Sequence, residues 1–149
     1  MQPAAVKVSA PAVTGDALVA AQNSQLEKVS VQGFARGKAA VPSREWDSWA
    51  ETAAPVLKEI LSAIPSGYAL QVTGHTDSLG SEGVRRNVYI GNRILSFRRA
   101  QAVVASLRKQ GIGSKCIVAA GAGSSEPLDG VAADDPRQRR VSFKLVKVR

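Results

Sequence analysis

The alternation of apolar and polar residues predicts strands in four parts of the chain. Successive side chains of a strand point to opposite faces, so a half-buried strand shows a period of two. The clearest case is the C-terminal stretch RRVSFKLVKV, where Val141, Phe143 and Leu145 share one face. The predicted strands cover residues 27–35, 68–74, 116–120 and 139–148.

Two longer stretches show the spacing of three and four residues that is typical of amphipathic helices. The first spans residues 43–64, and we expect Pro55 to kink it or to split it in two. Its Trp46 and Trp49 suit either a sugar-stacking platform or core packing, and their helical spacing favours the core. The second helix runs from about residue 92 to residue 110 and ends before Gly111.

The order of these elements is β-α-β-α-β-β, which predicts an α+β fold. Strands joined by helices of this length form parallel βαβ units, and the last strand should add in the antiparallel direction. We therefore expect a two-layer sandwich, with one mixed sheet and two main helices packed on one face. Residues 27–149 form this domain, and residues 1–26 are interpreted as an N-terminal arm with a helical turn or more after Asp16.

Composition fits one modest domain and adds a strong basic bias. The 149 residues include 20 Lys and Arg against 12 Asp and Glu, so the net charge is +8. Such a charge favours acidic partners, which include nucleic acid, anionic lipid and carboxylate-rich polymers. Aromatic residues make up only 5% of the chain, which argues against RNA recognition, and we expect no nucleic-acid partner.

No stretch reaches the length and apolarity of a membrane helix or shows the pattern of a signal peptide. We therefore expect membrane association only through other parts of a parent protein, and an export signal removed earlier is compatible with this pattern. The single cysteine, Cys116, excludes an intrachain disulfide and is interpreted as a small buried hydrophobe.

Candidate chemistry centres on VTGHTDSLGS, residues 72–81, which contains the only histidine of the chain, His75. A Ser-His-Asp mechanism needs one marked nucleophile, and no G-x-S-x-G elbow is present. A metal site needs further ligands at suitable spacing, and none accompanies His75 and Asp77. We therefore expect no catalytic residue, no metal and no cofactor, and interpret His75 as a structural hydrogen-bonding residue.

The helix that follows places Arg99 at the border of its apolar stripe, in one row with Asn92 and Ser96. Arg98 points about 100° away and should be solvated. A half-buried arginine calls for a carboxylate partner, and Asp77 leaves the strand that feeds this helix. Two interpretations remain open from the residues alone: an Asp77–Arg99 salt bridge, or a clamp in which Asp77 binds an ammonium and Arg99 binds a carboxylate.

Five blocks in order resemble the OmpA-like peptidoglycan-binding domain, the C-terminal domain of OmpA, MotB and Pal type proteins. The blocks are GHTDSLG, NRILSFRRA, QGI, GAGSSEP and QRRVSF. They fall within residues 72–143, and residues 29–65 fit the preceding strand and helix of the family. The order and number of matching blocks make the resemblance specific.

The resemblance implies a non-enzymatic module of the periplasm or cell envelope, associated with the outer membrane through its parent protein. It would anchor that protein to the cell wall by holding the diamino acid of a peptidoglycan stem peptide. Asp77 would hold the ammonium of that amino acid and Arg99 its carboxylate. Thr76, Asn92 and Leu95 would shape the pocket, and Arg140 would line or support it. A homo-oligomer is compatible with this interpretation.

The chain also departs from the family pattern. The loop between Asp77 and Asn92 is longer, and the insert SEGVRRNVYIG at residues 81–91 would cover the pocket, block it or make another contact. Asn87 competes with Asn92 for the family's asparagine, and the register of N-x-x-L-S favours Asn92. The alternative function is an interaction or scaffolding domain in which this insert has weakened or abolished peptidoglycan binding.

Overall fold

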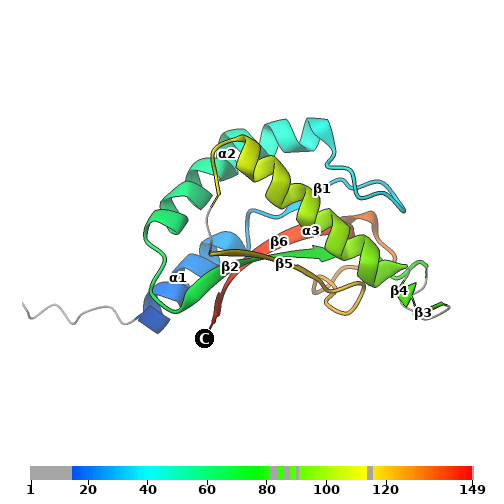
Figure 1. Cartoon of the computed structure of the whole chain (residues 1–149). Coiled ribbons are helices and arrows are strands. Elements are labelled where there is room, and N and C mark those ends of the chain that lie inside the picture. Colours follow the sequence, from blue (N-terminus) through cyan, green and yellow to red (C-terminus); the bar gives the residue numbers. More distant parts are fainter. Residues whose placement is uncertain (1–14, 81–83, 86–87, 90, 114–115, 149) are drawn as a thin grey trace, which may run out of the picture.

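A mixed sheet of four strands, covered on one face by two helices, forms the centre of the molecule (Figure 1). The computed structural model describes residues 15–80, 84–85, 88–89, 91–113 and 116–148. The expected α+β class and the two-layer arrangement are confirmed. The strands of the sheet, in spatial order, are β1 (Val31–Gln32), β6 (Arg140–Lys147), β2 (Tyr68–His75) and β5 (Ile117–Gly121).

The strand directions follow from the connections. β2 and β5 are parallel and are joined by helix α3 (Asn92–Lys109), which crosses the sheet between them. The last strand, β6, inserts between β1 and β2 and is antiparallel to both. The carboxyl end of β2 therefore lies beside the start of β6, with His75 opposite Arg140.

Helix α2 (Ser43–Ser62) continues through Pro55 and changes direction along its length, so the predicted kink does not divide it (Figure 1). Its first helical residue is Ser43, and Pro42 takes the N-cap position. Trp46 and Trp49 are buried, stack on each other at 4.8 Å between ring centroids, and Trp49 stacks on Phe143. These contacts place both tryptophans in the core, as their spacing predicted.

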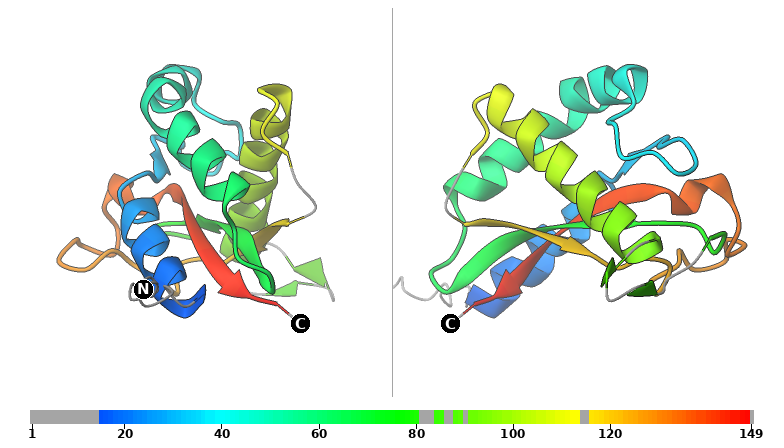
Figure 2. Two further views of the ribbon diagram at one scale, coloured as in Figure 1. Left: turned by 90° about the vertical axis from the view of Figure 1, so that its left-hand side faces the viewer. Right: turned by 45° about the vertical axis from the view of Figure 1, so that its right-hand side comes forward.

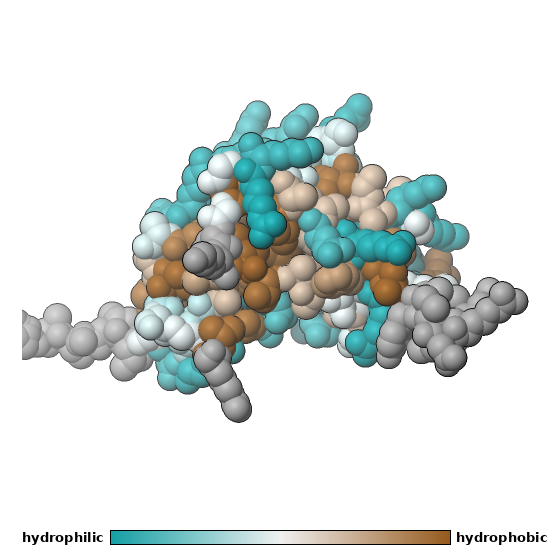
Figure 3. All heavy atoms as spheres, in the orientation of Figure 1, coloured by the Kyte–Doolittle hydropathy of each residue, from teal (hydrophilic) through white to brown (hydrophobic). Residues whose placement is uncertain are grey.

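Polar and charged residues cover the outer side of the helix layer, whereas the apolar residues of α2 and α3 face the sheet (Figure 3). No helix in the described part of the chain is long and apolar enough to cross a membrane. Cys116 is only partly buried, whereas the sequence predicted a small buried hydrophobe.

Residues 15–26 form helix α1 (Gly15–Leu26), which confirms the helical turn or more expected after Asp16, and this helix joins the core. The short strand β1 pairs only with the first residues of β6, and α1 lies beside the rest of β6 (Figure 2). Asn23 donates from Nδ2 to the Leu145 carbonyl at 3.2 Å and accepts at Oδ1 from the Leu145 amide at 2.7 Å. The Asn23 side chain thus makes the hydrogen bonds to Leu145 that a neighbouring strand would otherwise make. Val19 and Leu26 of α1 are buried.

The insert contains a small hairpin of β3 (Val84–Arg85) and β4 (Val88–Tyr89), with Val84 paired to Tyr89. The loop expected there is thus partly β structure. Asn87, the rival to Asn92, lies outside the described residues.

Candidate functional site

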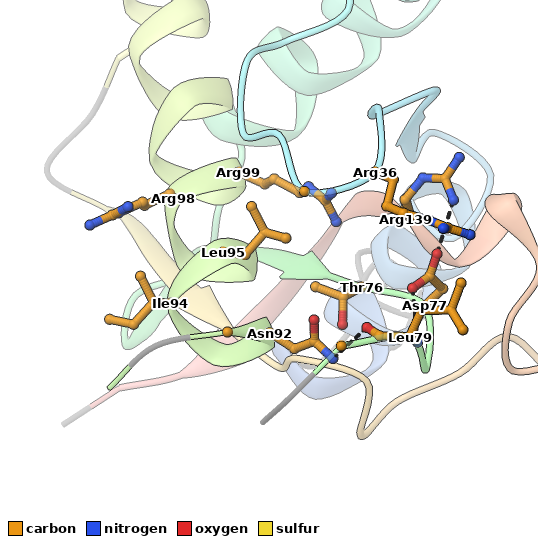
Figure 4. A pocket seen from close by; sticks show the side chains of 13 residues that line it. Arg36, Thr76, Asp77, Leu79, Asn92, Ile94, Leu95, Arg98, Arg99 and Arg139 are labelled. Atoms are coloured by element: carbon orange, nitrogen blue, oxygen red, sulfur yellow. Dashed lines mark hydrogen bonds and ion pairs between the residues drawn. The ribbon is translucent and has the colours of Figure 1, made fainter. Parts of the chain in front are cut away.

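A pocket of about 590 Å³ lies where the loop after β2, the start of α3 and the loop between β1 and α2 meet (Figure 4). Five of the six predicted site residues line it, and Arg140 does not. Its lining consists of Arg36, Gly37, Thr76, Asp77, Leu79, Gly80, Gly91, Asn92, Ile94, Leu95, Arg98, Arg99 and Arg139.

The end of β2 supplies the first two polar groups of the pocket. The Thr76 amide donates to the Gly123 carbonyl at 2.8 Å, which fixes the backbone, while the buried Thr76 hydroxyl has no hydrogen-bond partner among the described residues. Asp77 is also buried, and its Oδ1 accepts from the Leu79 amide at 3.1 Å. A buried hydroxyl without a partner costs free energy unless a ligand or water satisfies it.

The first turn of α3 supplies Asn92 and Leu95. Asn92 is the first helical residue, and its Nδ2 donates to the Leu79 carbonyl at 3.1 Å, so it ties the helix to the loop after β2. Gly80 turns this loop with a φ of 90°, and a Cβ there would lie 3.2 Å from Asn92 Oδ1. Leu95 is half-buried one turn further along and forms an apolar wall.

Arg99 is completely buried at the base of the site. Its guanidinium donates to three carbonyl oxygens: Nε to Lys38 at 2.8 Å, Nη1 to His75 at 2.9 Å and Nη2 to Ala35 at 3.1 Å. Burial, together with the nearby charge of Arg139, lowers the pKa of Arg99 to about 10, so it stays charged at neutral pH. No carboxylate among the described residues forms the predicted ion pair with Arg99, and its three donors bond to carbonyl oxygens instead.

Asp77 instead pairs with Arg139, whose Nη1 lies 2.9 Å from Asp77 Oδ2. The Asp77–Arg99 salt bridge, one of the two interpretations of the sequence, therefore does not form. Arg140, predicted to line or support the pocket, does not line it, and its Nη2 donates to the Glu126 carbonyl at 2.9 Å. Arg140 supports the loop before β6 rather than the pocket.

Arg139, Arg36 and Arg98 are charged lining residues that the sequence did not assign to the pocket, and Arg98 was expected only to be solvated. The alternation along the last strand holds a signal for the first of them. Val141, Phe143 and Leu145 face the helices, so a period of two places Arg139 with them and Arg140 on the opposite face. Arg36 lies on the loop between β1 and α2, where no periodic pattern marks it.

His75 is buried with its ring outside the pocket, where Nε2 lies 2.7 Å from Ser142 Oγ. Burial and the neighbouring Arg140 lower the pKa of His75 to about 3, so the ring is neutral at physiological pH. No group of three His, Cys, Asp or Glu side chains in the described ranges is arranged to hold a metal ion. The geometry supports the structural role that the sequence predicted for His75.

Comparison with known proteins gives a family match: the model of the OmpA family matches residues 34–140. Outer membrane protein A of Shimwellia blattae is 39% identical over 75 residues, which cover 50% of this chain and 28% of the relative. The protein of the same name from Escherichia coli O157:H7 is also 39% identical over 75 residues, with 20% of its length covered. The chain thus matches less than a third of the length of these relatives.

Solved structures show the same fold. The OmpA-like domain of FopA1 from Francisella tularensis subsp. tularensis SCHU S4 is 28% identical, with a TM-score of 0.57 over 78% of this chain and 70% of that one. The peptidoglycan-associated lipoprotein from Burkholderia pseudomallei has a TM-score of 0.58 at 24% identity, over 81% and 92% of the two chains. The periplasmic domain of Helicobacter pylori MotB has a TM-score of 0.55 at 17% identity, over 78% and 77%.

Proposed function

Because this chain belongs to the OmpA family, we propose that it is a non-catalytic module that binds peptidoglycan. Two proteins similar to this chain are named outer membrane protein A, and one similar structure is that of a peptidoglycan-associated lipoprotein. The function fits a domain of the periplasm or cell envelope that anchors its parent protein to the cell wall. The +8 net charge suits a polymer whose peptides carry carboxylates.

The observation that carries the proposal is the meeting of a buried carboxylate and a buried guanidinium in one pocket. Asp77 and Arg99 both line the pocket. Asp77 is only 3% exposed, and Arg99 is fully buried. An amino acid with free ammonium and carboxylate groups complements this pair, with the ammonium at Asp77 and the carboxylate toward Arg99. Charge-assisted hydrogen bonds of this kind contribute about 1.5–3 kcal/mol each.

Arg99 can serve such a ligand in two ways. Three of its five N–H groups go to carbonyl oxygens, and none of these acceptors carries a charge. Asp77 acts on Arg99 only through space and makes its ion pair with Arg139, so the charge of Arg99 stays largely available to a ligand. A ligand carboxylate would gain from this potential, and the two N–H groups that make no hydrogen bond within the described residues would offer it direct donors.

The other lining groups complete a site for a stem-peptide amino acid. The Thr76 hydroxyl offers an unused donor and acceptor, and Asn92 keeps the loop and helix at a fixed separation. Leu95 provides apolar contact for the methylene chain of a diamino acid. A single small site predicts moderate affinity, and many copies meeting one polymer would produce firm anchoring.

A second candidate is an OmpA-like interaction domain that does not grip peptidoglycan. The observation in its favour is the Asp77–Arg139 ion pair, because a ligand ammonium must share or displace an arginine that already balances this carboxylate. Gly80, which precedes the insert at residues 81–91, and Gly91, its last residue, both line the pocket and give a further reason to test this alternative.

Co-sedimentation with insoluble peptidoglycan tests the proposed function. We expect the wild-type chain in the pellet and Asp77→Asn largely in the supernatant, because the amide keeps the shape of the side chain but loses its charge. Asp47→Asn is the matched control, since Asp47 is exposed on α2 outside the pocket and the net charge changes equally. Wild-type protein that stays in the supernatant would refute the proposal and favour the interaction domain.

A further inference from the structure

The pocket contains more positive charge than one zwitterionic amino acid can balance. Among its described lining residues, the only carboxylate is that of Asp77, against four guanidinium groups from Arg36, Arg98, Arg99 and Arg139. A bound amino acid with one ammonium and one carboxylate adds no net charge. Like charges gathered in a partly enclosed site repel each other unless an anion is bound there.

The arginines divide into groups by position and partner. Arg139 balances Asp77, and Arg99 is held at the base of the site by carbonyl oxygens. Arg98 points away on the far side of Leu95 and Ile94, whereas the guanidinium groups of Arg36 and Arg139 lie together at the Asp77 end (Figure 4). Arg36 is exposed and makes no hydrogen bond or ion pair to another residue in the described ranges.

The loop that carries Arg36 is held firmly against the pocket by two other arginines. Arg139 Nε donates to the Phe34 carbonyl at 2.6 Å. Arg99 donates to the carbonyls of Ala35 and Lys38 at 3.1 and 2.8 Å, on either side of Arg36. The Phe34 ring also lies below the Arg99 guanidinium, with the carbon of that group 5.4 Å from the ring centroid. The backbone around Arg36 is thus fixed by the same residues that form the site, which lowers the ordering cost of binding there.

We propose that Arg36 and Arg139 together bind a second carboxylate of the ligand, next to the clamped amino acid. The proposal rests on the proposed function and names its ligand more closely: stem peptides that keep a free carboxylate beyond the one directed at Arg99. Guanidinium groups bind carboxylates through paired N–H donors, so a neutral carboxamide at this position loses the charge and one acceptor atom. The site therefore selects free over amidated stem peptides.

The test uses calorimetric titration of the full chain with two synthetic stem tetrapeptides. Both keep the free ammonium and carboxylate at the end of the diamino acid. One has every other carboxylate free, and the other has them all amidated. We expect the wild-type chain to bind the free peptide about tenfold more tightly, which is the size of effect that one charge-assisted contact gives.

Three variants separate the contribution of Arg36 from general electrostatics. Arg36→Gln should bind both peptides at the affinity of the amidated one, while Arg36→Lys should keep part of the preference. Arg108→Gln removes the same charge from an exposed position in the last turn of α3 and should leave the preference unchanged. The difference in binding free energy between the two peptides is compared between the wild type and Arg36→Gln. This comparison isolates the coupling between Arg36 and the second carboxylate.

The outcomes are distinct. Equal binding of both peptides by the wild-type chain, with binding lost in Asp77→Asn, would overturn the second carboxylate site and leave the proposed function standing. A preference for the free peptide that survives Arg36→Gln would assign it to another residue and overturn the role of Arg36. Failure of the wild-type chain to bind either peptide would overturn both proposals.

Discussion

A single buried guanidinium connects three parts of the chain that are far apart in the sequence. Arg99 on α3 donates to carbonyls of the loop at residues 35–38 and of His75 at the end of β2. A neutral side chain would leave those carbonyls without their donors. Arg99 is therefore a residue on which the shape of the pocket depends, in addition to its charge.

Replacement of Arg99 should lower stability as well as binding. We expect Arg99→Met to reduce the free energy of unfolding by roughly 2–4 kcal/mol, because three acceptors lose their donors while the apolar volume is kept. Urea denaturation measures this change. Arg98→Met is the control, since Arg98 is exposed, and it should change stability by less than about 0.5 kcal/mol. Equal effects of the two variants would contradict the structural role of Arg99.

His75 should make the domain less stable in mild acid. Burial lowers the pKa of His75 in the folded state to about 3, whereas in the unfolded chain it is about 6.5. As the pH falls below about 6.5, His75 is therefore protonated in the unfolded chain but not in the folded one. The stability gained from the neutral buried ring is fully present above about pH 6.5 and is lost as the pH falls toward 3. Between pH 7.5 and 5.5 we expect the free energy of unfolding to drop by about 1 kcal/mol more in the wild type than in His75→Asn, measured in urea. Parallel slopes for the two proteins would count against a buried neutral ring.

The residue scale also shows what the sequence could and could not predict. Helical geometry correctly distinguished the buried Arg99 from the exposed Arg98. Strand alternation holds a signal for Arg139 that was not used, because the family motif led to Arg140, which faces the other side of the sheet. The three carbonyl acceptors of Arg99 were beyond prediction, because they belong to segments that only the tertiary fold brings together.

At the scale of elements, α3 lies very close to the two strands that it connects. Two glycines allow this approach: a Cβ at Gly74 of β2 would overlap the Ser96 carbonyl oxygen, and one at Gly121 of β5 would lie 2.7 Å from the Phe97 amide. Ser96 then uses its hydroxyl to accept from the Gly123 amide at 2.9 Å. The start of α3, which carries Asn92 and Leu95, is thereby set at a fixed height above the end of β2.

Gly74→Ala should push α3 away from the sheet and disturb the pocket. The added methyl group meets backbone, which cannot move aside, so we expect a loss of roughly 3 kcal/mol or more in thermal or urea unfolding. Gly113→Ala is the control, because a Cβ there meets only the flexible side chain of Arg108, at 3.4 Å. If Gly74→Ala is as stable as the wild type, α3 and β2 are further apart than described.

The elements with strong periodicity were predicted well, and the weak ones only in part. The pattern of β2, β6, α2 and α3 is set by burial of one face, which the sequence records directly. Helix α1 buries only Val19, Gln22 and Leu26, and its attachment through Asn23 depends on the free edge of β6. The expected strand at 27–35 pairs only at Val31 and Gln32, because α1 takes the remaining edge.

At the scale of the whole molecule, the boundary of the folding unit can be tested by truncation. The chain of residues 27–149 should be roughly 3–5 kcal/mol less stable than the chain of residues 15–149. The loss reflects exposure of the surface that covers Val19 and Leu26, each worth about 1.5–3 kcal/mol when buried. Urea unfolding of the two truncated chains measures it. If the two truncated chains are equally stable, residues 15–26 are a dispensable arm.

The central claim is that a stem-peptide amino acid binds between the end of β2 and the start of α3. The most direct measurement is an NMR titration of the isotope-labelled chain with a soluble stem peptide, following each backbone amide. We predict that the largest shifts fall on Thr76, Asp77, Asn92 and Leu95, and that Asp77→Asn abolishes them at the same peptide concentration. Shifts concentrated on α1 and β5, or no shifts at all, would contradict the account.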